Sequence, residues 1–168
     1  MKLGTIYLDG KIVPIVQGIE GKAHSLLDVC KKFEIAQINS ILDLINLSKD
    51  NPNLLNNITN ASEELVGFDP IDWAPPIVNP SKILGVAFNN KELMKKAHKD
   101  PGVPNYFLKP PSALQAHEKP IIVDPDWGAV IPEPEICAVI GKRAKHISEE
   151  EALNYVFGYM IHNDVTSH

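Results

Sequence analysis

The sequence has no surplus of positive charge and no long apolar run, and these two absences exclude two classes of protein. Lysine and arginine number 16 against 21 aspartates and glutamates, which gives a formal net charge of −5. This balance offers no electrostatic footprint for a nucleic acid. No apolar stretch approaches the roughly 18 residues of a membrane span, and MKLGTIYLDGK lacks the apolar region of a signal peptide. We therefore expect a cytoplasmic protein whose partners are neither nucleic acids nor membranes.

Cysteine is also scarce, whereas proline is abundant. Cys30 and Cys137 stand far apart, outside any CxxC or Cys/His spacing, so we predict two small reduced core residues. The 14 prolines indicate many turns and strand edges and few long helices. Hydrophobic residues make up 44% of the chain, which is enough to form a core.

Residues 1–78 are predicted to form a small N-terminal domain that ends in a linker. Two β-rich runs flank Asp9-Gly10 in TIYLDGKIVPIV, which is a strong hairpin signal. Two runs with helical apolar spacing follow, then an asparagine-rich stretch expected to be a loop and a proline-rich linker: residues 23–33, 37–48, 49–61 and 68–82. We place the domain boundary near residue 79.

Residues 79–168 alternate short strands with two helices and are predicted to form a second domain. Ser148 and Glu151 have the spacing of a capping box, which predicts a helix over residues 148–156. The other expected elements are strands at 82–88, 135–142 and 157–164, an extended stretch at 106–114, a strand and turn at 120–128, and a basic helix at 90–99. The pattern predicts an α+β fold.

The stretch PEPEICAVIGK places two glutamates, Glu133 and Glu135, at the mouth of a predicted strand. Side chains on a strand alternate faces, so these two carboxylates point the same way, with Cβ atoms about 6–7 Å apart. Pro134 points to the other face and donates no hydrogen bond, which is typical of a strand start or an edge. A divalent ion between the carboxylates would offset their repulsion, and oxygen ligands favour Mg²⁺, Mn²⁺ or Ca²⁺ over zinc.

A third carboxylate stands at the end of the last predicted strand. Asp164 closes GYMIHND, and a strand–helix–strand passage would bring it near Glu135. Residue alternation puts His162 on the same face as Asp164, either beside the site or packed as a partly buried imidazole. Asn163 and Thr166 are candidates to orient the Asp164 loop through side-chain-to-backbone bonds. The spacing alone favours a solvated acidic strand edge, because acidic pairs are common on exposed strands.

Three stretches resemble the core of the fumarylacetoacetate hydrolase family: VIPEPEICAVIGKRAKHISEEEALNYVFGYMIHNDVTSH, FLKPPSAL and PSKILGVAFNN. The first matches the family pattern without a gap from E-x-E to N-D-V-[ST], and together the three cover residues 79–168. The resemblance implies that this part is the first portion of a mixed β-roll. It also implies that Glu133, Glu135 and Asp164 bind Mg²⁺ or Mn²⁺, with Ca²⁺ as a further candidate.

The resemblance further implies an enzyme that acts on a small 2-oxo or diketo acid through a metal-stabilised enolate. Family members include C–C bond hydrolases, decarboxylases, isomerases and dehydratases. Hydrolytic members carry a His–Glu dyad in N-Y-x-x-H-x-x-E, but the aligned positions here are Leu93 and Lys96. His98 lies further along the same predicted helix. Lys109 and His162 are weak catalytic candidates, and Lys109 either faces a substrate carboxylate or lies on the surface.

Family members continue for roughly a hundred residues beyond the point that matches His168. The resemblance therefore leaves a second hypothesis open. In it, the chain is a truncated, catalytically inactive remnant that binds a metal or a partner. A likeness to members that pair through the roll domain predicts a homodimer. The last strand, FGYMIHND, would present an unpaired edge, which also favours association.

Overall fold

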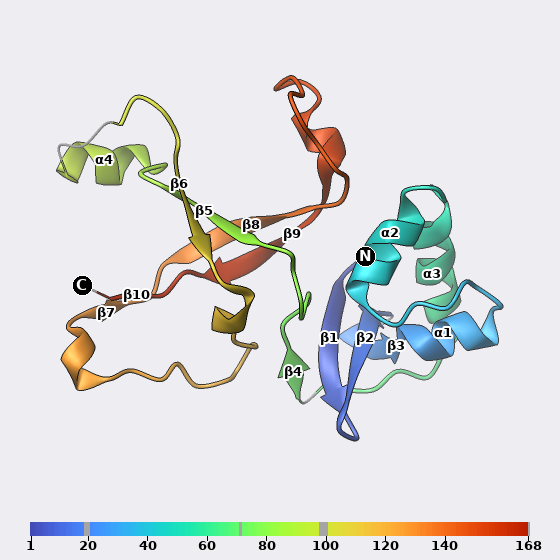
Figure 1. Ribbon diagram of the computed structural model, residues 1–168. Coiled ribbons are helices and arrows are strands. Elements are labelled where there is room, and N and C mark those ends of the chain that lie inside the picture. The colour runs from blue at the N-terminus through green and yellow to red at the C-terminus, as the bar shows by residue number, and fades with distance from the viewer. Residues whose placement is uncertain (19–20, 71, 98–100, 168) are drawn as a thin grey trace.

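The computed structural model describes residues 1–18, 21–70, 72–97 and 101–167, apart from the side chains of residues 93 and 97. The N-terminal part is built on a four-stranded antiparallel sheet with the order β3-β2-β1-β4 (Figure 1). Its strands are β1 (Leu3–Leu8), β2 (Lys11–Gln17), β3 (Ala23–Ser25) and β4 (Trp73–Ala74).

The predicted hairpin is confirmed in the pairing of β1 with β2. Asp9 and Gly10 both have positive φ, at 48° and 72°, as the tight two-residue hairpin turn requires. The register pairs Leu8 with Lys11 and runs back to Leu3 opposite Val16. The turn chemistry thus sets the register of the β1–β2 pair.

Three helices cover this sheet, and two of them begin at a serine cap. The Ser25 hydroxyl accepts from Asp28 N at the start of α1 (Leu26–Lys32), and Ser40 caps α2 (Ile41–Ser48) in the same way. The third helix, α3 (Leu54–Ser62), lies where we expected a loop over residues 49–61, and that prediction was wrong. Leu54, Ile58 and Ala61 form a buried stripe at helical spacing, and their burial outweighs the low helix propensity of the asparagines between them.

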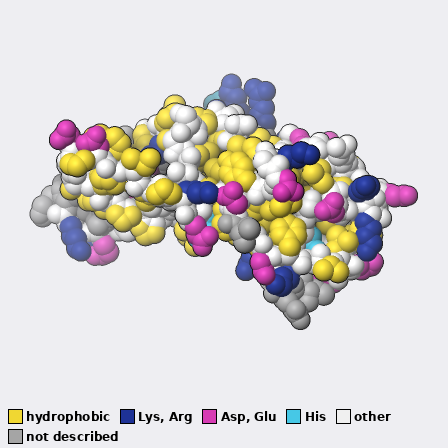
Figure 2. All heavy atoms as spheres, turned by 90° about the horizontal axis from the view of Figure 1, so that it is seen from below, with side chains coloured by type: hydrophobic (Ala, Val, Ile, Leu, Met, Phe, Trp, Pro, Cys, Tyr) yellow, Lys and Arg dark blue, Asp and Glu magenta, His cyan; other side chains and the backbone are white. Residues whose placement is uncertain are grey.

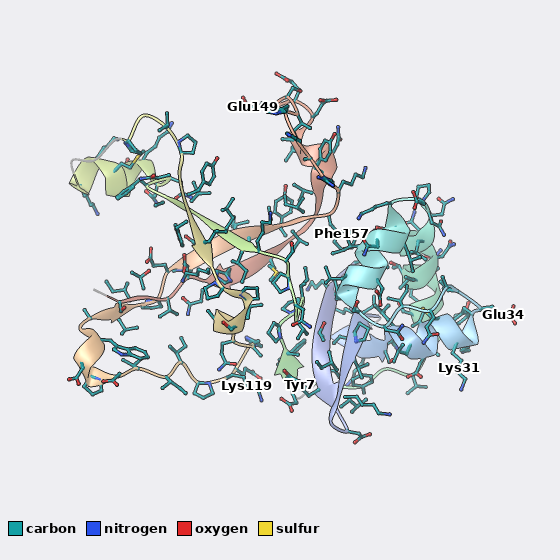
Figure 3. The ribbon with its side chains drawn as sticks, in the orientation of Figure 1. Tyr7, Lys31, Glu34, Lys119, Glu149 and Phe157 are labelled. Carbon is teal, nitrogen blue, oxygen red and sulfur yellow. The ribbon has the colours of Figure 1, made fainter. Side chains whose placement is uncertain are left out.

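The hydrophobic core belongs to the N-terminal part. Within the described ranges, every buried hydrophobic side chain lies between Ile6 and Ala74. One cluster joins β2 to the three helices and a smaller one lies on β1, β2 and β3. From the C-terminal part, Val139 and Phe157 pack against the larger cluster, and Figure 3 shows Phe157 between β9 and the helices. The chain therefore condenses around its first 74 residues.

The C-terminal part contains three separate two-stranded antiparallel sheets and a short helix. In the sheet formed by residues 83–87 and 105–109, Gly85 faces Phe107 so closely that a Cβ added to Gly85 would lie 2.1 Å from the phenyl ring. This close approach accounts for the glycine at position 85. The pairs are β5 (Ile83–Ala87) with β6 (Asn105–Lys109), β8 (Pro134–Ile140) with β9 (Val156–Asn163), and β7 (Val130–Ile131) with β10 (Thr166–Ser167), and the helix is α4 (Lys91–Ala97). The predicted α+β class is confirmed.

Two expected elements of this part differ in the structure. Residues 121–124 form no strand, and a 3₁₀ turn follows at Pro125–Trp127. Over 148–156 the capping bond is present, because Glu151 N donates to Ser148 Oγ at 3.3 Å, but only a 3₁₀ helix at Ala152–Tyr155 follows. Gly141 N donates to the Tyr155 carbonyl at 2.8 Å, so the β8–β9 ladder takes over before a full α-helix can form.

The β8–β9 pair has one covered and one bare face. Val139 and Phe157 lie toward the N-terminal core, whereas Ile136 and Ile161, which are register partners, are 82% and 86% exposed. Apolar side chains are prominent in the left half of Figure 2, where the C-terminal part lies.

No described helix has the length and apolar character to cross a bilayer. Cys30 and Cys137 are both free thiols, as predicted, but only Cys30 lies in the core, and Cys137 is half-buried.

One buried titratable group stands within the N-terminal sheet. His24 on β3 is 4% exposed, and its Nδ1 is buried without a hydrogen-bond partner. Gly18 and Gly67 flank the ring, and a Cβ on Gly18 would lie 2.2 Å from Nε2. Burial lowers the pKa of His24, because the imidazolium would lose its hydration.

This burial predicts that the N-terminal part loses stability in mild acid. The unfolded state holds His24 at an ordinary pKa near 6.5 and the folded state at a lower one, so below about pH 7 the unfolded state binds more protons. The free energy of unfolding should fall between pH 7 and pH 5, with a slope of at most about 1.4 kcal/mol per pH unit from this group. Denaturant titrations at several pH values measure it.

His24→Gln should remove this part of the pH dependence. His117→Gln is the control, because the His117 side chain is 71% exposed. An unchanged pH profile in His24→Gln would show that the loss comes from other groups.

Candidate functional site

The β8–β9 register brings the acidic residues to one face. Glu135 lies opposite His162, and Asp164 N donates to the Glu133 carbonyl at 2.9 Å, so Glu133 stands across from Asp164. Cross-strand neighbours share a face, and residues two apart on a strand share it as well. Pro134 opens the strand as predicted and is exposed on the opposite side. The same-face expectation for the three carboxylates and His162 thus agrees with the register.

The Asn163 side chain fixes the end of the β8–β9 pair at which Glu133 and Asp164 lie. Glu133 N donates to the Asn163 side-chain oxygen at 3.1 Å, in place of a regular ladder bond. The bond holds the residue before β8 against the end of β9, and β7–β10 pairing continues the contact with Ile131 opposite Thr166. Asn163 therefore acts on the backbone as the sequence suggested, although its partner is Glu133 and not the Asp164 loop.

Burial differs sharply among the three carboxylates. Asp164 is 5% exposed, whereas Glu133 and Glu135 are half-buried. Burial raises the pKa of the nearby Cys137 thiol, and the negative charge of Glu135 raises it further. Glu135 and Cys137 are two residues apart on β8 and therefore lie on the same half-buried face.

The buried Asp164 has a lysine partner. Lys109 Nζ contacts Asp164 Oδ1 and also donates to the Val165 carbonyl at 3.3 Å. Apart from this contact, Asp164 Oδ1 is buried without a hydrogen-bond partner. Lys109 ends β6, so the ion pair links the β5–β6 sheet to the end of β9. Sequence reasoning missed this pairing, because no local pattern connects residues 55 positions apart.

In this arrangement the carboxylates share a face without converging. Across the described ranges, no three His, Cys, Asp or Glu side chains lie close enough together to hold a metal ion. The donor set nevertheless fits a hard divalent cation in type, with three carboxylates on one face. The buried oxygen of Asp164 already has a cation against it, the ammonium of Lys109. The three carboxylates therefore suit a hard divalent cation in donor type and charge, but the described side chains are not gathered around one point.

The short helix that holds the dyad positions is also present. α4 includes Leu93 and Lys96, and the Asn90 side chain accepts from Glu92 N at its start. Glu92 forms an ion pair with Lys95 at 3.0 Å, and both side chains are 74% exposed. His98 lies outside the described residues. A hollow beside Lys2, Gln17 and Trp73 on the N-terminal sheet includes none of the acidic residues.

Comparison with known proteins identifies the relatives of this chain. Residues 82–168 match the family model described as fumarylacetoacetate (FAA) hydrolase C-terminal. A fumarylacetoacetate hydrolase domain-containing protein 2 homolog from Dictyostelium discoideum is 32% identical over 146 residues, which cover 77% of this chain and 48% of that protein. The mitochondrial oxaloacetate tautomerase fahd2 of Xenopus laevis is 29% identical over 109 residues, covering 64% of this chain and 34% of that one.

The fold has a counterpart among solved structures. Fumarylacetoacetate hydrolase from the psychrophile Exiguobacterium antarcticum superimposes with a TM-score of 0.69 at 23% identity, over 99% of this chain and 56% of that one. The chain spans about half the length or less of the curated relatives described above. The family model covers the strands that place the acidic residues, and the fold likeness extends over the N-terminal part as well. This chain belongs to the fumarylacetoacetate hydrolase family, whose members are enzymes.

Proposed function

We propose that the complete protein is a Mg²⁺- or Mn²⁺-dependent enzyme acting on a small 2-oxo or diketo acid through an enolate. The observation that carries the proposal is the common face of Glu133, Glu135 and Asp164, set by the β8–β9 register in a chain of this family. Ca²⁺ is a further candidate ion, since it takes the same oxygen ligands.

The three carboxylates would hold the cation and leave part of its coordination sphere to the substrate. When bound, the cation supplies positive charge where negative charge develops on the substrate oxygens. The chain itself would orient the carboxylates, because the hydrogen bond between Glu133 N and the Asn163 side chain fixes the start of β8. His162 lies opposite Glu135 and is a candidate for moving a proton. Burial of Asp164 restricts water on that side.

The dyad positions favour chemistry that needs no activated water. Leu93 has no ionisable group, and a protonated Lys96 cannot accept a proton as glutamate would. A positioned general base contributes about 10²–10⁴-fold to such a step. We therefore propose decarboxylation, dehydration or tautomerisation in preference to C–C bond hydrolysis. The similarity to an oxaloacetate tautomerase supports this choice, because a tautomerisation moves a proton and adds no water to the substrate.

A second candidate is a binding protein without turnover. The residues at the two dyad positions, Leu93 and Lys96, favour it. In that role the retained acidic residues would bind a metal or a partner only. Activity assays on the complete protein separate the two candidates.

We predict divalent metal binding through the three acidic residues. Titration calorimetry with Mg²⁺ and Mn²⁺ should detect one site, and Glu135→Ala should weaken binding at least about tenfold, because one of three charged ligands is lost. Glu149→Ala is the matched control, since Glu149 lies at an exposed loop tip (Figure 3). Equal binding by wild type and Glu135→Ala would reject the site.

We predict that activity follows the enolate and not the hydrolytic route. The complete protein with Mg²⁺ should tautomerise or decarboxylate oxaloacetate, and it should cleave an acylpyruvate at least about 100-fold more slowly than a dyad-bearing hydrolase. Ultraviolet absorbance of the enol and release of CO₂ measure the two outcomes on oxaloacetate. Acylpyruvate cleavage at about 1 s⁻¹ or faster would contradict the proposal. Loss of that cleavage in His98→Ala would then locate the base.

We also propose that the protein forms a homodimer, with the bare β8–β9 face as the surface between copies. Ile136 and Ile161 stand opposite each other there and are almost fully exposed, so a second copy of the same strands would cover them. Light scattering at micromolar concentration should give a mass above the 18.5 kDa of one chain. Ile136→Lys should shift it toward the monomer, whereas Leu42→Lys on the outer side of α2 should leave it unchanged. A wild-type monomer would contradict the dimer.

A further inference from the structure

The ion pair between Lys109 and Asp164 is the least solvent-exposed ion pair in the described part of the chain. The Asp164 side chain is 7% exposed and that of Lys109 is 26% exposed. The three other lysine–carboxylate pairs described all have partners that are at least 40% exposed. An exposed pair contributes little to stability, whereas a buried carboxylate that loses its partner is strongly unfavourable.

The position of this ion pair connects it to the proposed metal site. Asp164 is the most buried of the three carboxylates, and the strand register places Glu133 and Glu135 on the same face. Lys109 reaches it from another sheet and is held in place by the Val165 carbonyl as well. A metal ion held by all three carboxylates would compete with the Lys109 ammonium for the negative charge of Asp164. The two cations would also repel each other.

We propose that Lys109 is an internal counter-ion of Asp164, which a divalent metal must displace or push aside. The lysine keeps the buried carboxylate neutralised before metal arrives and thereby lowers the affinity of the site for metal. The inference rests on the proposed metal-dependent function. It assigns Lys109 a role different from the one considered for it in the sequence, that of meeting a substrate carboxylate.

The experiment uses the complete protein, freed of metal with EDTA, and two measurements: the melting temperature without metal and the dissociation constant for Mn²⁺. Lys109→Met should lower the metal-free melting temperature by about 5 °C or more, because Asp164 remains buried and unpaired. The same variant should bind Mn²⁺ at least about tenfold more tightly, because the competing charge is gone. Added Mn²⁺ should therefore raise its melting temperature more than that of the wild type.

Four further variants give the controls. Lys109→Arg retains the positive charge and should keep both values near those of the wild type. Lys119→Met removes a lysine from an exposed pair with Asp72 at 2.6 Å and should change neither value appreciably (Lys119 is labelled in Figure 3). Lys109→Gln repeats both measurements without a charge in case Lys109→Met fails to fold. Lys109→Met combined with Asp164→Asn should recover most of the metal-free stability.

The outcomes separate this inference from the proposed function. Weaker Mn²⁺ binding in Lys109→Met would show that the lysine orients Asp164 for the metal, and it would overturn the inference while leaving the metal site intact. Unchanged melting temperature and affinity would overturn it as well. If neither the wild type nor Lys109→Met binds Mn²⁺, both the competition and the metal dependence fail. If the wild type binds and Glu135→Ala does not, the metal site stands and Lys109→Met alone decides the inference.

Discussion

The antiparallel ladder between β8 and β9 is the interaction on which the candidate site depends. Its register sets Glu135 opposite His162 and Glu133 opposite Asp164, so like charges gather on one face. A shift by one residue would send Glu135 to the bare face and Ile136 inward. The bond from Glu133 N to the Asn163 side chain holds the end of the ladder against such a shift. Backbone pairing, more than side-chain attraction, therefore assembles the acidic face.

The features that depend on neighbouring residues could be predicted from the sequence. Asp9-Gly10 specifies its own turn, and the alternation of Glu133 with Pro134 and Glu135 follows from strand geometry. Predictions failed where contacts distant in sequence decided the outcome. The helix α3 forms because Leu54 and Ile58 reach a core assembled from other elements. No neighbouring residue indicates this.

The site shows the same division between local and distant information. Glu133 and Glu135 could be predicted to share a face because they are two residues apart on one strand. Asp164 could be predicted as a third member because it stands at the end of the next predicted strand. The contact of Lys109 with Asp164 requires β6 to lie beside the end of β9, which is a matter of tertiary placement. The same holds for the packing of Phe157 on the N-terminal core. A sequence pattern therefore shows which acidic residues share a strand face more readily than it shows which lysine lies against them.

The sheet order β3-β2-β1-β4 has a consequence for the time course of folding. β4 returns to the free edge of β1, so the unit that holds every buried hydrophobic side chain of the described residues can close only after residue 74 has been made. During synthesis this unit can collapse on the ribosome while β8 and β9 are still absent, since chains fold unit by unit from the N-terminus. The strands β8 and β9 then pack against a unit that has already folded, through Val139 and Phe157. A slow-folding variant in the first 74 residues would thus delay the site without touching any residue in it.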